Sequence, residues 1–191
     1  MRLIMGLLMS LFLGLDMYLY ESKYLGHWPH QKDDPDGEYQ AAEVVHEAAG
    51  IVNPLAEDGG SITVQATVMK WRKANQIHNW FVQNVQGGVD ECQESEVTIE
   101  ELKELRETIA NVLDARGTDL EDEVVKSLLP PQSGFFFGGT EVDQWYWRDL
   151  EETFEGLTTL IHRTELHKAK LVAKTGNEYA GSTYFIYQAS W

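Results

Sequence analysis

Residues 70–85 read KWRKANQIHNWFVQNV, and this stretch decides how the rest of the chain is interpreted. Four apolar residues recur at helical spacing and predict an amphipathic helix over Lys70–Val85: they are Ala74, Ile77, Phe81 and Val85. Cations, amides, an imidazole and indoles occupy most other positions: Lys70, Trp71, Arg72, Lys73, Asn75, Gln76, His78, Asn79 and Trp80. Because a plain surface helix favours Glu and Lys over Asn and His, we interpret them as a recognition surface for something flat and polar.

Composition limits the class of protein. The chain has 191 residues, of which 43% are hydrophobic and 11% aromatic, and this predicts a folded globule with one domain over residues 14–191. Its formal net charge of −16 repels nucleic acid and anionic membranes, so neither is expected as a direct partner. Cys92 is the single cysteine, which fits a reducing cytoplasm.

Residues 1–13, MRLIMGLLMSLFL, form an apolar N-terminal extension after Arg2. They are similar to a secretory signal, but no small-x-small cleavage site follows and the run is too short to span a bilayer. We favour an upstream start codon or an added buried strand over export. Folding is expected not to require these residues.

The predicted elements indicate an α+β fold. Alternating patterns predict strands at Leu15–Tyr24, Ser61–Val68 and Ser182–Ser190. Further helices are predicted at Glu38–Ala49, Thr98–Arg116, Asp119–Leu129 and Thr140–Leu166. Because the strands do not alternate regularly with helices, we expect a small mixed or antiparallel sheet of the N-terminal, middle and C-terminal strands, covered by three to four helices. Thr98 and Glu101 form a capping-box pattern at the start of their helix.

Two aromatic stretches have both a structural and a functional interpretation. Residues 132–139, QSGFFFGG, are either a core strand or plug, or an aromatic wall beside backbone that can approach a ligand closely. In the helix predicted at Thr140–Leu166, Trp145 and Trp147 lie off the centre of the apolar stripe. They form either a second packing surface or a stacking site.

Two polar stretches leave similar alternatives. His27 and His30, followed by Asp33 and Asp34, could ligate a metal, but no second ligand pair at a recognisable spacing supports this, so we predict no metal and no cofactor. Between Asp90 and Glu123 the chain has 13 acidic and 3 basic residues. That segment is either a solvated helix face or a negative docking surface for a basic host protein.

Several long motifs together resemble a family of small phage and prophage proteins with no established activity. They are GLDMYL at 14–19, WRKANQIHNWF at 71–81, GVDEC at 88–92, LPPQSGFFFG at 129–138, the D-x-W-Y pattern from Asp143, and YQASW at 187–191. The resemblance covers nearly the whole chain from Gly14 and implies a phage setting. Proteins of that family usually begin at Met-Gly-Leu-Asp, whereas Leu13 and twelve further residues precede Gly14 here.

The sequence has no P-loop, nucleophile elbow, HExxH or zinc-type cysteine spacing, so an enzyme is the less favoured class. We expect a phage accessory protein that binds a nucleotide-like small molecule and sequesters a host immune signal. The central helix, the Phe135–Phe137 segment and the start of the Thr140 helix are predicted to converge on one concave site. The predicted ligand-binding residues are Trp71, Arg72, Lys73, Asn75, His78, Asn79, Phe136, Trp145, Trp147 and Arg148.

Other functions stay open. An acidic decoy that imitates a nucleic-acid backbone would bind a basic host protein through Asp90–Glu123. An enzyme acting on a nucleotide is a further alternative, because a carboxylate paired with His78 would leave no motif in the sequence. A structural phage component and a homo-oligomer are equally compatible with the chain.

Overall fold

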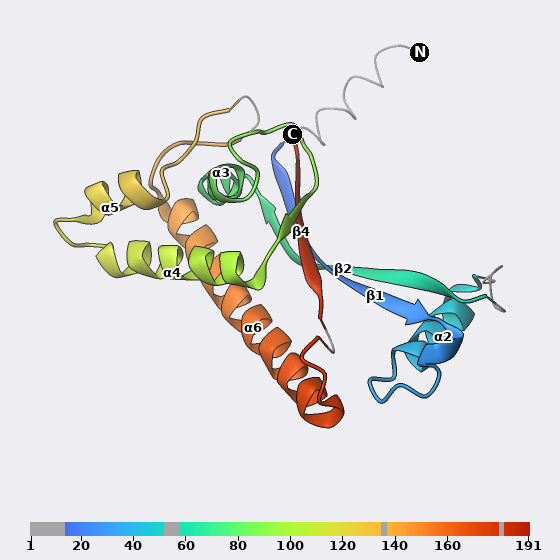
Figure 1. The fold of residues 1–191 in the computed structure, drawn as a ribbon. Helices are drawn as coiled ribbons and strands as arrows, with labels where there is room; N and C mark the ends of the chain where they lie inside the picture. Colours follow the sequence, from blue (N-terminus) through green and yellow to red (C-terminus); the bar gives the residue numbers. More distant parts are fainter. Residues whose placement is uncertain (1–13, 52–57, 135–136, 180–181) are drawn as a thin grey trace, which may run out of the picture. The chain divides into compact units, whose positions relative to one another are not determined.

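The computed structural model describes residues 14–51, 58–134, 137–179 and 182–191, so the predictions for residues 1–13 and Phe136 lie outside it. Within these residues the fold is α+β, as predicted, with five helices and a four-stranded antiparallel sheet in the order β2-β1-β4-β3 (Figure 1). In chain order the elements are β1 (Asp16–His27), the 3-10 turn η1 (Pro29–Gln31), α2 (Glu38–Ala49), β2 (Gly60–Arg72), α3 (Asn75–Asn84), β3 (Ser95–Val97), α4 (Ile99–Ala115), α5 (Glu121–Leu128), α6 (Gln144–Thr175) and β4 (Tyr184–Ser190).

The N-terminal, middle and C-terminal strands β1, β2 and β4 lie in one sheet, as predicted, and the first and last of them are neighbours. The sequence did not predict β3, which pairs antiparallel with β4 so that Ser95 faces Tyr187 and Val97 faces Phe185. Three residues within an acidic segment are too few to show an alternating pattern. Only their pairing with β4 makes them a strand.

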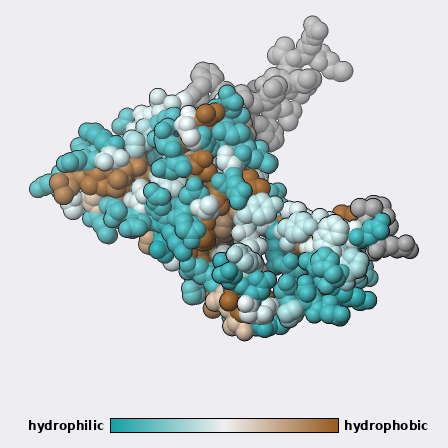
Figure 2. Space-filling view, in the orientation of Figure 1, coloured by the Kyte–Doolittle hydropathy of each residue, from teal (hydrophilic) through white to brown (hydrophobic). Residues whose placement is uncertain are grey.

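The chain divides into two compact units, and the larger one comprises residues 14–20, 67–161 and 185–191 of the described chain. Its core joins the buried faces of β1 and β4 to α3, α4, α5 and the first half of α6. Leu15, Met17 and Leu19 are fully buried, as the alternation of β1 predicts. Over α4 and α5, apolar residues also gather at the surface among hydrophilic ones (Figure 2), and Leu120 and Leu128 are exposed there.

The smaller unit comprises Glu21–Ala66 and His162–Tyr184. Its helix α2 has the predicted bounds and buries only Ala42. The ring of His27 stacks on Tyr39 with centroids 4.2 Å apart, and Lys23 pairs with Glu38 at 3.3 Å. The prediction of one domain over residues 14–191 stays a prediction.

The central helix begins later than predicted. Strand β2 continues through Arg72, and α3 starts only at Asn75 after Ala74 at the N-cap. Lys73 has a φ of 63°, in the left-handed region, and its N–H donates to the Leu15 carbonyl at 2.8 Å. This backbone bend ends the strand, so Lys70, Arg72 and Lys73 do not lie in the first turn of a helix.

Helix α3 is also not a surface helix. Seven of its residues are buried, and Asn75, Gln76 and His78 are among them. Each buried polar side chain on α3 therefore needs a hydrogen-bond partner or a reason to lack one.

The other helices follow the sequence more closely. The Thr98 hydroxyl accepts from the Glu101 N–H at 3.1 Å and the Glu101 carboxylate accepts from the Thr98 N–H at 2.7 Å, which confirms the capping box of α4. Helix α6 begins at Gln144, where Asp143 Oδ1 accepts from two backbone N–H groups, and it continues to Thr175, beyond the predicted end. Trp147 is buried against the core, although the sequence placed it off the centre of the apolar stripe. Trp145, which the sequence also placed off the stripe, is exposed.

His78 connects α3 to the C-terminal strand. Its Nδ1 lies 2.7 Å from the Tyr187 hydroxyl and its Nε2 lies 3.0 Å from Asp90 Oδ2, while the Trp191 indole N–H donates to the other Asp90 oxygen at 3.1 Å. Burial, and then Asp90, raise the pKa of Tyr187, so its hydroxyl stays protonated and donates. With Nε2–H donating to Asp90, the His78 ring accepts the Tyr187 hydrogen bond at Nδ1.

The Tyr187→Phe variant removes one hydroxyl from this network and keeps the ring that stacks on Phe81. We expect the free energy of unfolding to fall by about 1–3 kcal/mol, because the Nδ1 atom of the buried His78 loses its donor. Urea unfolding measures the change. The control is Tyr179→Phe, at an exposed position, and an equal loss in both variants would show that the network contributes nothing.

Candidate functional site

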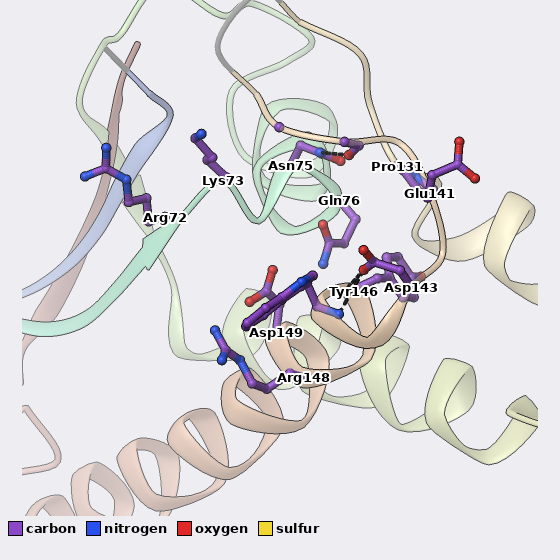
Figure 3. Close-up of a pocket in the computed structure, with 13 residues that line it drawn as sticks. Arg72, Lys73, Asn75, Gln76, Pro131, Glu141, Asp143, Tyr146, Arg148 and Asp149 are labelled. Carbon is purple, nitrogen blue, oxygen red and sulfur yellow. Dashed lines mark hydrogen bonds between the residues drawn. The ribbon is translucent and has the colours of Figure 1, made fainter. Parts of the chain in front are cut away.

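A cavity of about 270 Å³ opens in the larger unit (Figure 3). Three segments that are far apart in the sequence line it. They are the end of β2 with the start of α3, the connection before α6, and the first turns of α6; the lining residues are Arg72, Lys73, Asn75, Gln76, Pro131, Gly138, Gly139, Glu141, Asp143, Trp145, Tyr146, Arg148 and Asp149. Two of the three segments predicted to converge, the one from Arg72 to Gln76 and the start of α6, line this concave surface, whereas Phe137 is not among its lining residues.

Asn75 holds the wall of this pocket in place. Its amide nitrogen donates to the carbonyls of Phe137 at 3.1 Å and Gly139 at 2.9 Å, and its Oδ1 accepts from the Gln132 N–H at 2.8 Å. One buried side chain thus satisfies three backbone groups of a segment that has no regular secondary structure of its own. Asn75 serves the site by positioning its wall.

Close backbone approach completes this part of the pocket. Gly138 has a φ of 93°, and a Cβ atom there would lie 3.2 Å from the Cβ of Lys73. Both the left-handed backbone and the tight contact favour glycine at this position. The glycine of the FFFG motif therefore allows the wall to lie against the end of β2.

The cationic end of the pocket comes from the end of β2. Arg72 is about half exposed, and its guanidinium lies 3.7 Å from Asp16. Lys73 is exposed beside it. Two adjacent cations at a rim can hold an anionic group such as a phosphate.

Helix α6 contributes an aromatic platform. The Arg148 guanidinium lies over the ring of Trp145, with Cζ 4.4 Å from the centroid, and its Nε is 3.4 Å from Glu152. Trp145 is 53% exposed, which leaves much of the indole accessible. An exposed indole beside a guanidinium offers a stacking surface for a planar group.

The polar floor of the pocket joins α3 to α6. Gln76 is buried, and its Nε2 has no hydrogen-bond partner among the described residues. Asp149 is partly buried, and burial raises the pKa of its carboxyl to about 6, against the opposing effects of Arg148 and the Gln76 amide. The Gln76 amide therefore lies beside the Asp149 carboxyl at the floor of the pocket. Carboxyl groups with a strongly raised pKa in a concave site are typical of functional positions.

The pocket gathers five of the ten predicted ligand-binding residues, four others lie elsewhere, and Phe136 lies outside the described residues. Arg72, Lys73, Asn75, Trp145 and Arg148 line it. Trp71 is buried, and its indole N–H donates to the Thr153 hydroxyl at 2.8 Å. His78 belongs to the network with Tyr187, and Asn79 is part-buried outside the lining. Trp147 lies under the Arg116 guanidinium. Phe137 is buried edge-on to His78, which favours the core interpretation for that residue of the FFF run.

Sequence reasoning missed the acidic side of the site. Glu141, Asp143 and Asp149 line the pocket together with Gln76. The sole available signal was the position of Asp149, one helical turn after Trp145 on the same face. Since its environment depends on Gln76, which is 73 residues earlier, the sequence did not indicate its burial.

Among the described residues, the His, Cys, Asp and Glu side chains form no group of three or more that could hold a metal ion. Among the helices in that part of the chain, none combines the length and the apolar character needed to cross a membrane. Comparison of the chain with family models, with curated proteins and with solved structures gave no match.

The Asn75→Asp variant keeps the size of the side chain and replaces the amide donor by a carboxylate oxygen facing two carbonyls. We expect the free energy of unfolding to fall by about 2–4 kcal/mol, because two hydrogen bonds are lost and a buried charge is repelled. Chemical denaturation measures this. Asn79→Asp makes the same chemical change on α3 without those carbonyl contacts, and we expect less than about 1 kcal/mol there; similar losses would contradict the role of Asn75.

Proposed function

We propose that this chain is a phage accessory protein that binds a nucleotide-like small molecule in the pocket and acts by sequestering it. The observation that carries the proposal is the meeting of Arg72 and Lys73 with the Trp145–Arg148 platform around one cavity. A cation holds the phosphate of a nucleotide, an aromatic face stacks on the base, and polar groups bind the edge of the sugar. The lining residues supply all three kinds of group.

The magnitudes are sufficient for binding at cellular concentrations. A phosphate held by Arg72 and a base stacked on an indole each contribute about 1–3 kcal/mol. Two or three such contacts in a preformed pocket correspond to micromolar affinity or better, after the cost of association. The Asn75 hydrogen bonds supply that preformed wall.

The lining residues include no histidine, serine, threonine or cysteine, and the groups among them that could act as a general base are the carboxylates Glu141, Asp143 and Asp149. We propose sequestration because the contacts described above account for binding without a further step. Binding without conversion needs only contacts. The resemblance to phage proteins makes a nucleotide signal of a host immune system the target that we propose.

Calorimetric titration with nucleoside monophosphates and cyclic nucleotides tests the proposal. In the Arg72→Ala variant we expect the affinity to fall about tenfold or more, because the phosphate loses a charged hydrogen-bond donor. The matched control is Lys126→Ala, which removes one exposed cation on α5 outside the pocket and should leave the affinity unchanged.

The ligand is then recovered by denaturing the complex. An unaltered ligand supports sequestration, whereas a converted one shows that the chain is an enzyme acting on a nucleotide. The absence of binding by every nucleotide, or an equal loss in both variants, would remove the pocket from consideration as a nucleotide site.

The acidic decoy is the second candidate, and the geometry of α4 favours it. Glu100, Glu104 and Glu107 are exposed along one side of the helix, away from its buried stripe of Leu102, Leu105, Ile109 and Val112. A row of carboxylates on a regular helix is a surface that a basic protein can bind.

Changing these three glutamates to glutamine should abolish inhibition of a basic host protein, and inhibition by the native chain should weaken steeply as salt rises. Binding assays at two salt concentrations measure both effects. The control changes Asp33, Asp34 and Glu47, which are exposed in the smaller unit, to their amides. An inhibition that survives the α4 changes would exclude the decoy.

A further inference from the structure

The pocket has opposite charges at its two ends. Figure 3 shows Arg72 and Lys73 on one side of the cavity and Glu141 and Asp143 on the other, with Gln76 and Asp149 between them. A ligand that fits this arrangement has two ends of different charge character. Its anionic end faces the two cations, and its other end offers hydrogen-bond donors to the carboxylates.

Gln76 supplies an unused donor at the floor. The side chain is 3% exposed, and its Nε2 makes no hydrogen bond within the described parts of the chain. A buried N–H without a partner costs about 1–3 kcal/mol. Since Gln76 lines the cavity, a ligand acceptor placed there would remove that cost.

Asp149 supplies acceptors next to this donor. Its carboxyl is close enough to the Gln76 amide for the amide to lower its pKa, and yet burial keeps that pKa raised to about 6. Burial thus disfavours the charged form of this carboxyl, and a ligand donor placed beside it would stabilise that form. Gln76 and Asp149 together present one donor beside two acceptor oxygens.

We propose, on the basis of the proposed function, that the ligand is a guanine mononucleotide with its phosphate at Arg72 and Lys73 and its base edge at Gln76 and Asp149. Guanine carries the O6 acceptor next to two N–H donors, on N1 and N2. The acceptor matches Gln76 Nε2, and the two donors match the two oxygens of Asp149. Adenine, cytosine and uracil each place only one ring or amino donor next to their acceptor.

The size of the cavity agrees with one nucleotide. Ligand pockets commonly measure about 300–1,000 Å³, and this one, at about 270 Å³, lies just below that range. A cyclic di- or trinucleotide would extend well beyond it. The pocket therefore favours a single nucleotide over the larger signals.

Titration calorimetry with GMP, IMP and AMP tests this assignment. IMP keeps O6 and N1–H but lacks the N2 amino group, so we expect GMP to bind about tenfold more tightly than IMP. In Asp149→Asn this preference should disappear, because the amide cannot accept two hydrogen bonds from the base edge. Glu155→Gln, at an exposed position on the same helix but outside the lining, should keep it, and thermal unfolding checks that both variants fold.

The pH dependence of GMP binding is a second measurement of the contact between Asp149 and the base. The charged and polar groups that act on Asp149 are Arg148, Glu152, Asp143 and Gln76, and Arg72, Lys73 and Glu141 also line the cavity. Ionised Asp149 can accept from both base donors, whereas protonated Asp149 keeps one acceptor oxygen and accepts from only one of them. GMP affinity should therefore rise between about pH 5 and pH 7, and this rise should be absent in Asp149→Asn.

The outcomes separate this inference from the function on which it rests. Equal binding of GMP, IMP and AMP, a preference that survives in Asp149→Asn, or affinity that falls as the pH rises would overturn the guanine assignment and leave nucleotide binding in place. Failure of all three nucleotides to bind would overturn both.

Discussion

The side chain of Asn75 is the contact on which the candidate site depends. It joins the first residue of α3 to a segment about sixty residues later through three hydrogen bonds. Without them, the connection before α6 would have no fixed position against β2, because no helix or strand of its own orders it. The cations at the end of β2 and the indole of α6 face one cavity only while this connection is in place.

Helix α3 explains why polar residues appear where an ordinary helix would have leucine. Its three buried polar side chains differ in what they contact. Asn75 holds the wall, His78 links to β4 through Tyr187, and Gln76 reaches the cavity with one N–H unsatisfied. Satisfied buried polar groups favour one arrangement of the chain over others, since a shift would leave them unpaired. The unsatisfied one is the exception that needs a functional explanation.

The charged residues around the pocket determine which way a ligand can be oriented in it. The chain as a whole is strongly acidic, with a formal net charge of −16, and yet Arg72, Lys73 and Arg148 lie around one cavity. Such a field disfavours anions in general, so a phosphate needs these local cations to bind. Charged neighbours on both sides then restrict which ligand fits and in which orientation.

The sequence by itself determined the α+β fold, the membership of the first and last strands in one sheet, the bounds of α2 and the capping box of α4. These features depend on residue patterns within one segment, where spacing alone shows which side is buried. The end of β2 depended instead on the backbone of Lys73, which turns into the left-handed region as its N–H bonds to Leu15. Residue types do not show such a contact in advance.

Tertiary structure also decided which predicted residues share the site. Trp71, His78 and Trp147 have the same chemistry as ligand-binding residues but are buried in the core, whereas Gln76 and Asp149 line the pocket from positions 73 residues apart in the chain. Burial and hydrogen bonding of a side chain depend on what packs against it from elsewhere in the chain. The sequence thus indicated the kinds of residue that form the pocket, and packing selected the members.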